Sequence, residues 1–226
     1  MRDPRLRKIP LRVRKHAQTR VALLQALLQE LRDKPLDAVA VRDLCDHAEV
    51  SEATFFNYFS RKTELLGYLR DVWALELVWW GRRVAEDQPG LKAVEAVYDK
   101  LAEQSQQHPG AMMEILALHA QSREKPEPAD IPLAERLIAF PEHEGIEDVA
   151  SGGVESVLVP NLEQAMQKKE LPANTPLPLV MMSLAGIFYG VPMALLPAQA
   201  AHLPSAYRQQ LSLLWSGLRA AARGGR

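Results

Sequence analysis

One stretch, residues 41–66, constrains the fold of this chain more than any other: VRDLCDHAEVSEATFFNYFSRKTELL. From Val41 onward, apolar residues recur at helical spacing. A short break follows, and then Ser51 and Glu52 form a typical helix start, because the serine oxygen can cap the helix and the acid suits the positive end of its dipole. The pattern predicts two short helices joined by a tight turn, with a third helix beginning near Lys62.

The second of these helices has two different faces. At about 100° per residue, Phe55 and Phe59 lie on one face, whereas Ala53 and Asn57 point away from it. We expect the aromatic face to be buried against the other two helices. The opposite face is then free to contact another molecule.

This segment resembles a known family. The run 48–66, AEVSEATFFNYFSRKTELL, is similar to the helix-turn-helix of the TetR family of bacterial transcriptional regulators, whose pattern is A-x-V-S-x-x-T-aromatic-Y-x-[YH]-F-x-x-K-x-x-L. The resemblance extends upstream, where residues 18–33 would be the family's first helix, and it covers about the first third of the chain. The matching positions are Ala48, Val50, Ser51, Thr54, Phe55, Tyr58, Phe59, Lys62 and Leu65.

The resemblance implies an all-α protein with an N-terminal three-helix DNA-binding domain and a larger helical C-terminal domain for ligand binding and dimerisation. It also implies a homodimer that binds a pseudo-palindromic operator in double-stranded DNA and acts as a repressor released by a small apolar effector. Asn57 would read a base edge, and Lys62 would bind a phosphate. The positions expected to contact DNA are Arg42, Ser51, Ala53, Thr54, Phe56, Asn57, Tyr58 and Lys62.

Three positions depart from the family pattern. Glu49 stands where the family usually has the glycine of the turn, and a residue with a Cβ is strained there by about 1 kcal/mol if φ is positive. Ala40 replaces a capping threonine, and Phe56 replaces a tyrosine whose hydroxyl touches phosphate. We therefore expect a lower non-specific affinity for DNA.

Composition agrees with a soluble globular protein, since 47% of the 226 residues are hydrophobic and 24% are charged. The net charge of −1 hides an asymmetry, because residues 1–70 hold fourteen Lys and Arg against nine Asp and Glu. We expect residues 1–16 to form a basic arm that contacts phosphates, residues 17–77 to form the DNA-binding domain, and residues 78–226 to form the C-terminal domain. The one cysteine, Cys45, lies on an apolar stripe and is expected to be a core thiol in a cytoplasmic protein.

Residues 175–196 carry no charge, and about 20 such residues can span a bilayer. Pro178, Pro192 and the lack of basic anchors favour instead a helix buried in a bundle or a subunit interface. The expected dimer interface comprises Leu184, Ile187, Gly190, Val191, Leu211, Leu214 and Leu218. The expected effector pocket comprises Trp79, Met112, Leu116, Met182, Phe188 and Tyr189.

Two alternatives to a DNA-binding regulator follow from the same sequence. The first is a helical adaptor that has lost DNA binding, which the three departures from the family pattern motivate. The second is an all-α enzyme, but the six histidines show neither an HxxxH pair nor cysteine partners. We expect no catalytic residue, no metal site and no cofactor.

Overall fold

The computed structural model describes residues 4–122, 129–150 and 153–224. Within these ranges every regular element is a helix, so the predicted all-α fold is confirmed. Contacts divide the chain into two compact units, which are described separately below. Unit 1 is Met1–Leu75 with Gly110–Ser151, and unit 2 is Glu76–Pro109 with Gly152–Arg226.

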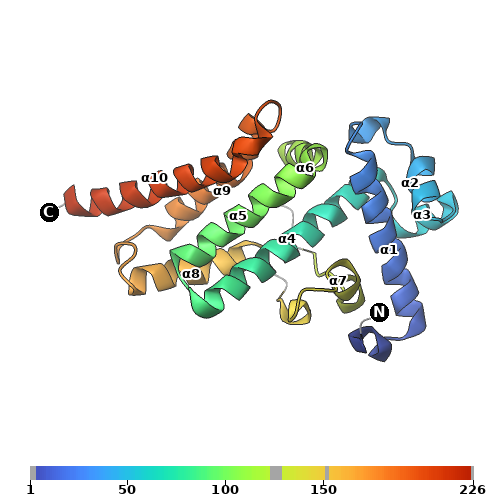
Figure 1. Cartoon of the computed structure of the whole chain (residues 1–226), viewed down its shortest axis with the longest axis horizontal. Helices are drawn as coiled ribbons and strands as arrows, with labels where there is room; N and C mark the ends of the chain where they lie inside the picture. Colours follow the sequence, from blue (N-terminus) through green and yellow to red (C-terminus); the bar gives the residue numbers. More distant parts are fainter. Residues whose placement is uncertain (1–3, 123–128, 151–152, 225–226) are drawn as a thin grey trace. The chain divides into compact units, whose positions relative to one another are not determined.

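The first part of unit 1 contains the predicted helix-turn-helix (Figure 1). Helix α1 (Leu11–Glu30) is joined by the short 3-10 turn η2 (Leu36–Ala38) to α2 (Val41–His47), and α3 (Glu52–Tyr58) follows after the turn. Helix α4 (Lys62–Asp87) then begins, and its second half belongs to unit 2. The side chains at the centre of this cluster are fully buried: Leu23, Leu27, Leu44, Phe55, Leu65 and Leu69.

Helix α1 begins at Leu11 and not near residue 18, as the sequence pattern had predicted. Residues 11–16, which we expected to belong to a basic arm, are therefore the first turns of a helix. Pro10 precedes α1, where its missing N–H group costs nothing, and the buried stripe of the helix already includes Ala17 at 1% exposure. Upstream, the 3-10 turn η1 (Pro4–Lys8) is tied to the second part of unit 1 by Arg5, whose guanidinium lies 2.7 Å from the carboxylate of Glu147.

The second part of unit 1 consists of α6 (Pro109–Gln121), α7 (Leu133–Ala139) and the 3-10 turn η3 (Ile146–Asp148). We had assigned these residues to the C-terminal domain, but contacts group them with the helix-turn-helix. The predicted boundary at residue 77, between a DNA-binding domain and a domain for ligand binding and dimerisation, stays a prediction. A Cβ at Gly110 would lie 1.9 Å from the carbonyl oxygen of Leu31, so glycine allows α6 to start against the end of α1.

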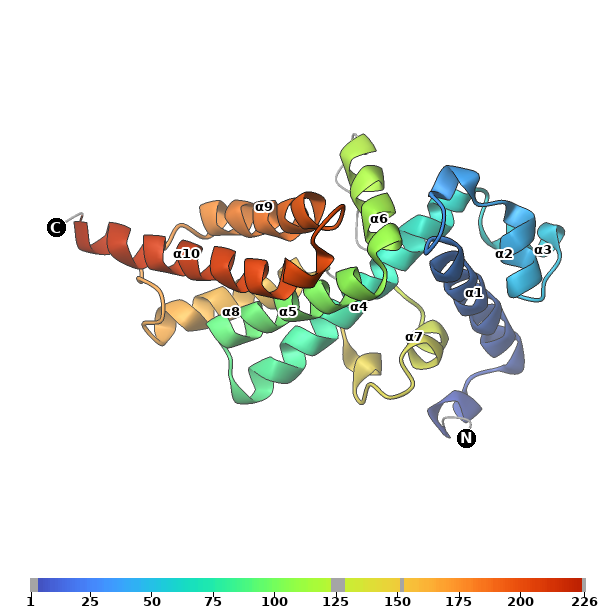
Figure 2. The same cartoon turned by 45° about the horizontal axis from the view of Figure 1, so that its top comes forward.

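Unit 2 is a helical bundle, in which α5, α9 and α10 run alongside one another (Figure 2). Two buried tyrosines fasten α9 to its neighbours, because the Tyr98 hydroxyl donates to the Leu184 carbonyl at 2.8 Å and the Tyr207 hydroxyl donates to the Phe188 carbonyl at 3.0 Å. Besides the end of α4, the elements are α5 (Leu91–Gln107), α8 (Glu155–Gln167), α9 (Leu177–Leu195), the 3-10 turn η4 (Ala200–His202) and α10 (Leu203–Gly224).

By length and composition, helix α9 is long and apolar enough to cross a membrane. Of its most apolar stretch, 22% is buried within the structure. Its inner face, with Val180 and Leu184 at 0% exposure, is packed inside unit 2. Its outer face is apolar and exposed, with Leu179 at 51%, Met182 at 66% and Met193 at 53%. The packing of the inner face and the tyrosine hydrogen bonds to α9 favour a bundle helix with one exposed apolar face.

Candidate nucleic-acid interface

The turn between α2 and α3 is short and well defined. The N–H of Val50 donates to the carbonyl of Cys45 at 3.0 Å, which closes the turn. Glu49 has a φ of 54°, so it adopts the left-handed conformation for which the TetR pattern usually supplies glycine. The predicted strain at this position is therefore present in the structure, at a cost of about 1 kcal/mol.

Helix α3 is held by a cap at one end and by an aromatic anchor along its inner face. Ser51 is the N-cap, and its Oγ accepts the N–H of Thr54 at 3.1 Å. The same Oγ lies 2.9 Å from the Thr54 hydroxyl, so both side chains are used within the helix start. Phe55 is completely buried, and its ring packs 6.1 Å from that of Phe59. These contacts fix the direction in which the outer face of α3 points.

The outer face of α3 presents the side chains that the sequence predicted. Ala53 and Asn57 are exposed, and Phe56 is 53% exposed although it is aromatic. Tyr58 is half-buried beside them. Arg42, on α2, extends into solvent with its side chain 80% exposed. An exposed amide next to an exposed aromatic ring, on a helix fixed from behind, is suited to hydrogen bonding and apolar contact in a groove.

Lys62 makes contacts within the chain that the sequence did not predict. Its ammonium donates to three backbone carbonyls of the α1–α2 connection, at 2.7 Å to Leu36, 3.1 Å to Asp37 and 2.6 Å to Val39. Because an ammonium has three hydrogens, this set of acceptors uses its full capacity. Lys62 therefore holds the connection in front of α2, and phosphate binding by this residue stays an untested prediction.

Glu114 on α6 supports the same connection from another side. Its carboxylate accepts the N–H of Leu36 at 3.2 Å. The α1–α2 connection is thus fixed by the first residue of α4 and by α6 together. No sequence pattern indicates this role, because Glu114 is one acidic residue on a distant helix.

A charged cluster ties α1 to α2. The Lys34 ammonium pairs with the carboxylates of Glu30 and, at 2.7 Å, of Asp43, and the His47 ring lies 3.1 Å from Glu30. The hydrogen bonds that Lys34 donates to Asp43 and Glu30 raise the pKa of Lys34, and the bond from Lys34 lowers the pKa of Asp43 below its usual value. Both side chains are half-buried and still reached by water, so the cluster serves mainly to orient the two helices.

A second cluster joins α1, α4 and α7 with Phe59, the residue that follows α3. The Arg20 guanidinium lies 4.3 Å above the Tyr68 ring and 4.7 Å above the Phe59 ring, and its Nε is 3.1 Å from the carboxylate of Glu135. Glu135 is only 2% exposed. Burial, followed by the charge of Glu135, raises the pKa of Tyr68 well above its usual range, so this phenol remains neutral. Sequence reasoning did not identify Glu135.

Comparison with known families agrees with this geometry. The family described as "Bacterial regulatory proteins, tetR family" matches residues 23–69, which include the end of α1, all of α2 and α3, and the start of α4. Residues 23–69 are therefore a tetR-family DNA-binding domain. The tetR-type domain makes DNA binding and the regulation of transcription the general role of this chain, and its helix α3 is called the recognition helix below.

The whole fold is similar to the solved structure of the ketosteroid transcriptional regulator KstR2 of Mycobacterium tuberculosis. The TM-score is 0.55 and the sequence identity is 17%, over 88% of this chain and 94% of that chain. At this identity the similarity concerns the fold alone. Among the curated proteins, none matches the sequence.

The residues predicted for a dimer interface divide into two groups. Leu184, Val191 and Leu211 are at most 9% exposed and face the interior of their own unit, so we correct their assignment to the interface. Gly190 is exposed. The remaining three are half-buried: Ile187, Leu214 and Leu218.

The residues predicted for an effector pocket are not gathered within one unit. Met112 and Leu116 are buried in unit 1, whereas Trp79 is half-buried in unit 2. Met182 is 66% exposed on the outer face of α9, which removes it from any interior pocket of its own unit. Phe188 and Tyr189 lie together in unit 2, with ring centroids 5.0 Å apart.

Cys45 is a buried core thiol, and burial raises its pKa, so the thiolate that would be needed for a nucleophile or a metal ligand is disfavoured. Among the residues that the structure describes, there is no group of three or more His, Cys, Asp and Glu side chains that could hold a metal ion.

Proposed function

We propose that this chain is a sequence-specific DNA-binding regulator that acts as a homodimeric repressor. The observation that carries the proposal is the recognition helix itself, which is capped by Ser51, anchored by Phe55 and exposes Asn57 and Phe56 on its free face. An asparagine amide can form two hydrogen bonds with adenine, and an aromatic side chain can contact a thymine methyl group. Such contacts discriminate between sequences, whereas contacts to phosphate do not.

Dimerisation is supported by the outer faces of α9 and α10. A band of apolar or small residues runs along α9 and includes Leu179, Met182, Gly186, Gly190 and Met193, all of which are exposed. On α10, Leu213 is 68% exposed. An exposed apolar surface of this kind usually marks a protein contact, and a two-fold axis through it would pair each band with its copy in a second chain.

A shallow groove of about 440 Å³ lies between these two helices and is bordered by Ser183, Gly190, Ala194 and Gln210. The small residues along it, Gly186, Gly190 and Ala194, leave room for a helix of the second chain. In this arrangement the two recognition helices would meet a pseudo-palindromic site, because the operator must share the symmetry of the dimer.

An apolar effector is the second part of the proposal. In unit 2 the rings of Tyr98, Phe188, Tyr189 and Tyr207 form a continuous cluster, with neighbouring centroids 5.0 to 6.1 Å apart. We propose that an apolar molecule binds beside Phe188 and Tyr189, which are half-buried, and that α4 links this binding to the DNA-binding domain because one continuous helix belongs to both units. An effector releases DNA only if it binds the DNA-free conformation more tightly.

The test is selection of bound duplexes from a random pool, with the wild-type chain and with the Asn57→Ala variant. The wild-type chain should enrich an inverted repeat, and the variant should lose the preference at one base pair of each half-site. Enrichment of no sequence by the wild-type chain would favour the helical adaptor instead. For the effector, a thermal-shift screen of apolar compounds, ketosteroids among them, should yield a ligand that stabilises the protein and releases the selected duplex.

A further inference from the structure

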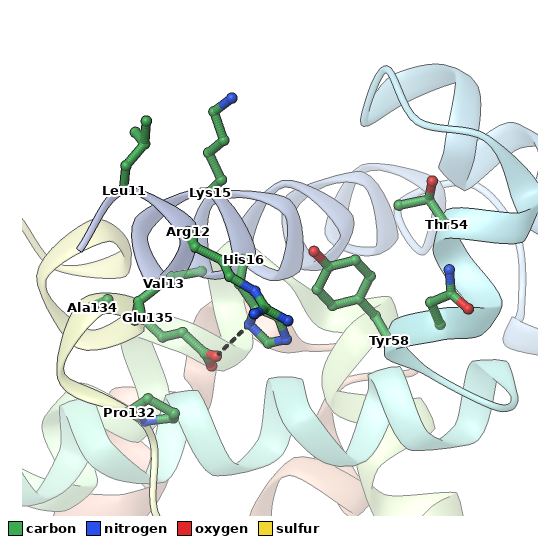
Figure 3. Close-up of a pocket in the computed structure, with 12 residues that line it drawn as sticks. Leu11, Arg12, Val13, Lys15, His16, Thr54, Tyr58, Pro132, Ala134 and Glu135 are labelled. Atoms are coloured by element: carbon green, nitrogen blue, oxygen red, sulfur yellow. Dashed lines mark ion pairs between the residues drawn. The ribbon is translucent and has the colours of Figure 1, made fainter. Parts of the chain in front are cut away.

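A cleft of about 990 Å³ lies beside the recognition helix in unit 1 (Figure 3). Its walls are the first turns of α1, including Arg12 and His16, the end of the recognition helix, with Asn57 and Tyr58, and the start of α7, with Glu135. Asn57 is also the residue proposed to read a base. The cleft therefore opens next to the surface at which DNA would lie.

His16 occupies the centre of this cleft. Its ring lies 4.6 Å from the Tyr58 ring, and its Nδ1 is 3.9 Å from the Glu135 carboxylate (Figure 3). The side chain of His16 is 55% exposed, whereas that of Glu135 is 2% exposed. His16 is thus in contact with the recognition helix on one side and with a buried carboxylate on the other, while remaining open to solvent.

Arg12 lies one helical turn before His16 and extends on the same side of α1 (Figure 3). It is exposed, and no ion pair joins it to any other residue in the described part of the chain. In contrast, Arg20 is paired with Glu135. Lys15 also borders the cleft but points away from His16. Arg12 is therefore the cation in this cleft that is available for a new partner.

We propose that this cleft is a second DNA-backbone site, in which Arg12 and protonated His16 bind a phosphate next to the recognition helix, so that DNA binding takes up protons. This inference rests on the proposed DNA binding of the chain. The occupant is a phosphodiester, because the cleft combines an unpaired guanidinium, a titratable imidazole and the hydroxyl of Tyr58 beside a base-reading residue.

The charges around His16 determine whether DNA binding takes up or releases a proton. On its own helix it faces the cations Arg12 and Arg20, on the recognition helix it faces Tyr58, and on α7 it faces Glu135. On α4, the neutral phenol of Tyr68 packs against Arg20. Glu135 faces both Arg20 and His16, so its single negative charge balances only part of the positive charge that Arg20 and a protonated His16 carry before DNA binds. An arriving phosphate supplies the missing negative charge and favours protonation.

The expected size of the effect follows from counting charges. Each phosphate contact contributes about 0.9 to the slope of log Kd against log salt, so loss of the Arg12 contact should lower this slope by roughly 1 per subunit. Proton uptake at one histidine per subunit gives an affinity that rises as pH falls, by at most about tenfold per pH unit per subunit, between about pH 5 and 8.

The experiment measures Kd for the selected duplex by fluorescence anisotropy, from pH 5.5 to 8.5 at constant ionic strength and then from 50 to 300 mM KCl. His16→Gln should abolish the pH dependence, and Arg12→Ala should lower the salt slope by about 1 per subunit while retaining the base preference.

Two matched controls separate this site from general effects. Arg32→Ala removes an exposed cation beyond the other end of α1 and should leave the salt slope unchanged. His47→Gln removes the histidine of the α1–α2 cluster and should retain the pH dependence. A wild-type affinity that is independent of pH, a pH dependence that survives in His16→Gln, or an unchanged salt slope in Arg12→Ala overturns the inference, even when Asn57→Ala shows that the chain reads sequence. Absence of any selected sequence overturns the proposed function as well.

Discussion

Replacement of Lys62 by methionine separates two roles that a lysine at this position can have. In the structure the Lys62 ammonium is bonded to the carbonyls of Leu36, Asp37 and Val39, whereas the family resemblance implied a contact with phosphate. Methionine retains most of the volume of the side chain but can donate no hydrogen bond. The variant therefore leaves these carbonyls without their partner while disturbing the packing little.

The loss of stability in Lys62→Met follows from the three hydrogen bonds that the ammonium donates. A hydrogen bond from a charged group contributes about 1.5–3 kcal/mol to stability. The bonds to Leu36 and Val39 are partly buried, but the bond to Asp37 is exposed, and water can replace its donor. Water also reaches part of the bonds to Leu36 and Val39, so we expect the free energy of unfolding to fall by about 2–3 kcal/mol in total. In a chain of this length that loss lowers Tm by about 4 to 12 °C.

Circular dichroism melts measure this change, and hydrogen exchange of residues 36–47 localises it. Arg61→Met is the control, because the adjacent Arg61 side chain is 75% exposed and its ion pair with Glu64 is long, at 3.7 Å; it should change stability by less than about 0.5 kcal/mol. A Lys62→Met variant with an unchanged Tm and a salt slope lowered by about 1 per subunit would refute the positioning role and restore the phosphate contact.

Further outcomes are expected elsewhere in the chain. Asn57→Ala should cost about 1–3 kcal/mol in binding to the selected duplex, measured by anisotropy, and should relax one base position. Gly190→Arg should give a monomer in sedimentation, because the position is exposed and a Cβ there meets nothing within 4 Å. Ser51→Ala should lower the stability measured by urea unfolding by about 1 kcal/mol through loss of the helix cap. Asp43 has a lowered pKa because of its bond from Lys34, so its contribution is present above the usual value of 3.8 and is lost as pH falls through the lowered pKa. Asp43→Asn should flatten this part of the pH–stability curve in acid unfolding.

The helix-turn-helix could be predicted because its signals are local. The spacing of Phe55 and Phe59 determines which face of the recognition helix is buried, and Ser51 caps the helix within three residues of its own position. The same spacing places Asn57 on the exposed face of the recognition helix. None of these inferences requires knowledge of a distant part of the chain.

The contacts that were missed join residues far apart in sequence. Glu135 on α7 approaches Arg20 and His16 of α1 through packing between elements far apart in sequence, and no local pattern encodes that packing. Lys62 has a long, flexible side chain that can reach either a phosphate or a carbonyl, so its position in a motif does not determine its partner.

The interface residues of α9 were difficult to predict for another reason. Residues 175–196 carry no charge, so no polar stripe distinguishes the side that faces the subunit interior from the side that faces a partner. The prediction consequently included Leu184 and Val191, which are buried in their own unit, and omitted Leu179 and Met193, which are exposed.

The central claim is that unit 1 reads DNA sequence, and a competition measurement tests it most directly. The Kd of the full-length chain for the selected duplex is compared with its Kd for a scrambled duplex of equal length at 150 mM KCl. We expect the selected duplex to bind at least about 10³-fold more tightly, as specific DNA-binding proteins do. Equal affinities for the two duplexes, with identical salt slopes, would contradict the claim, because binding would then come from charge alone.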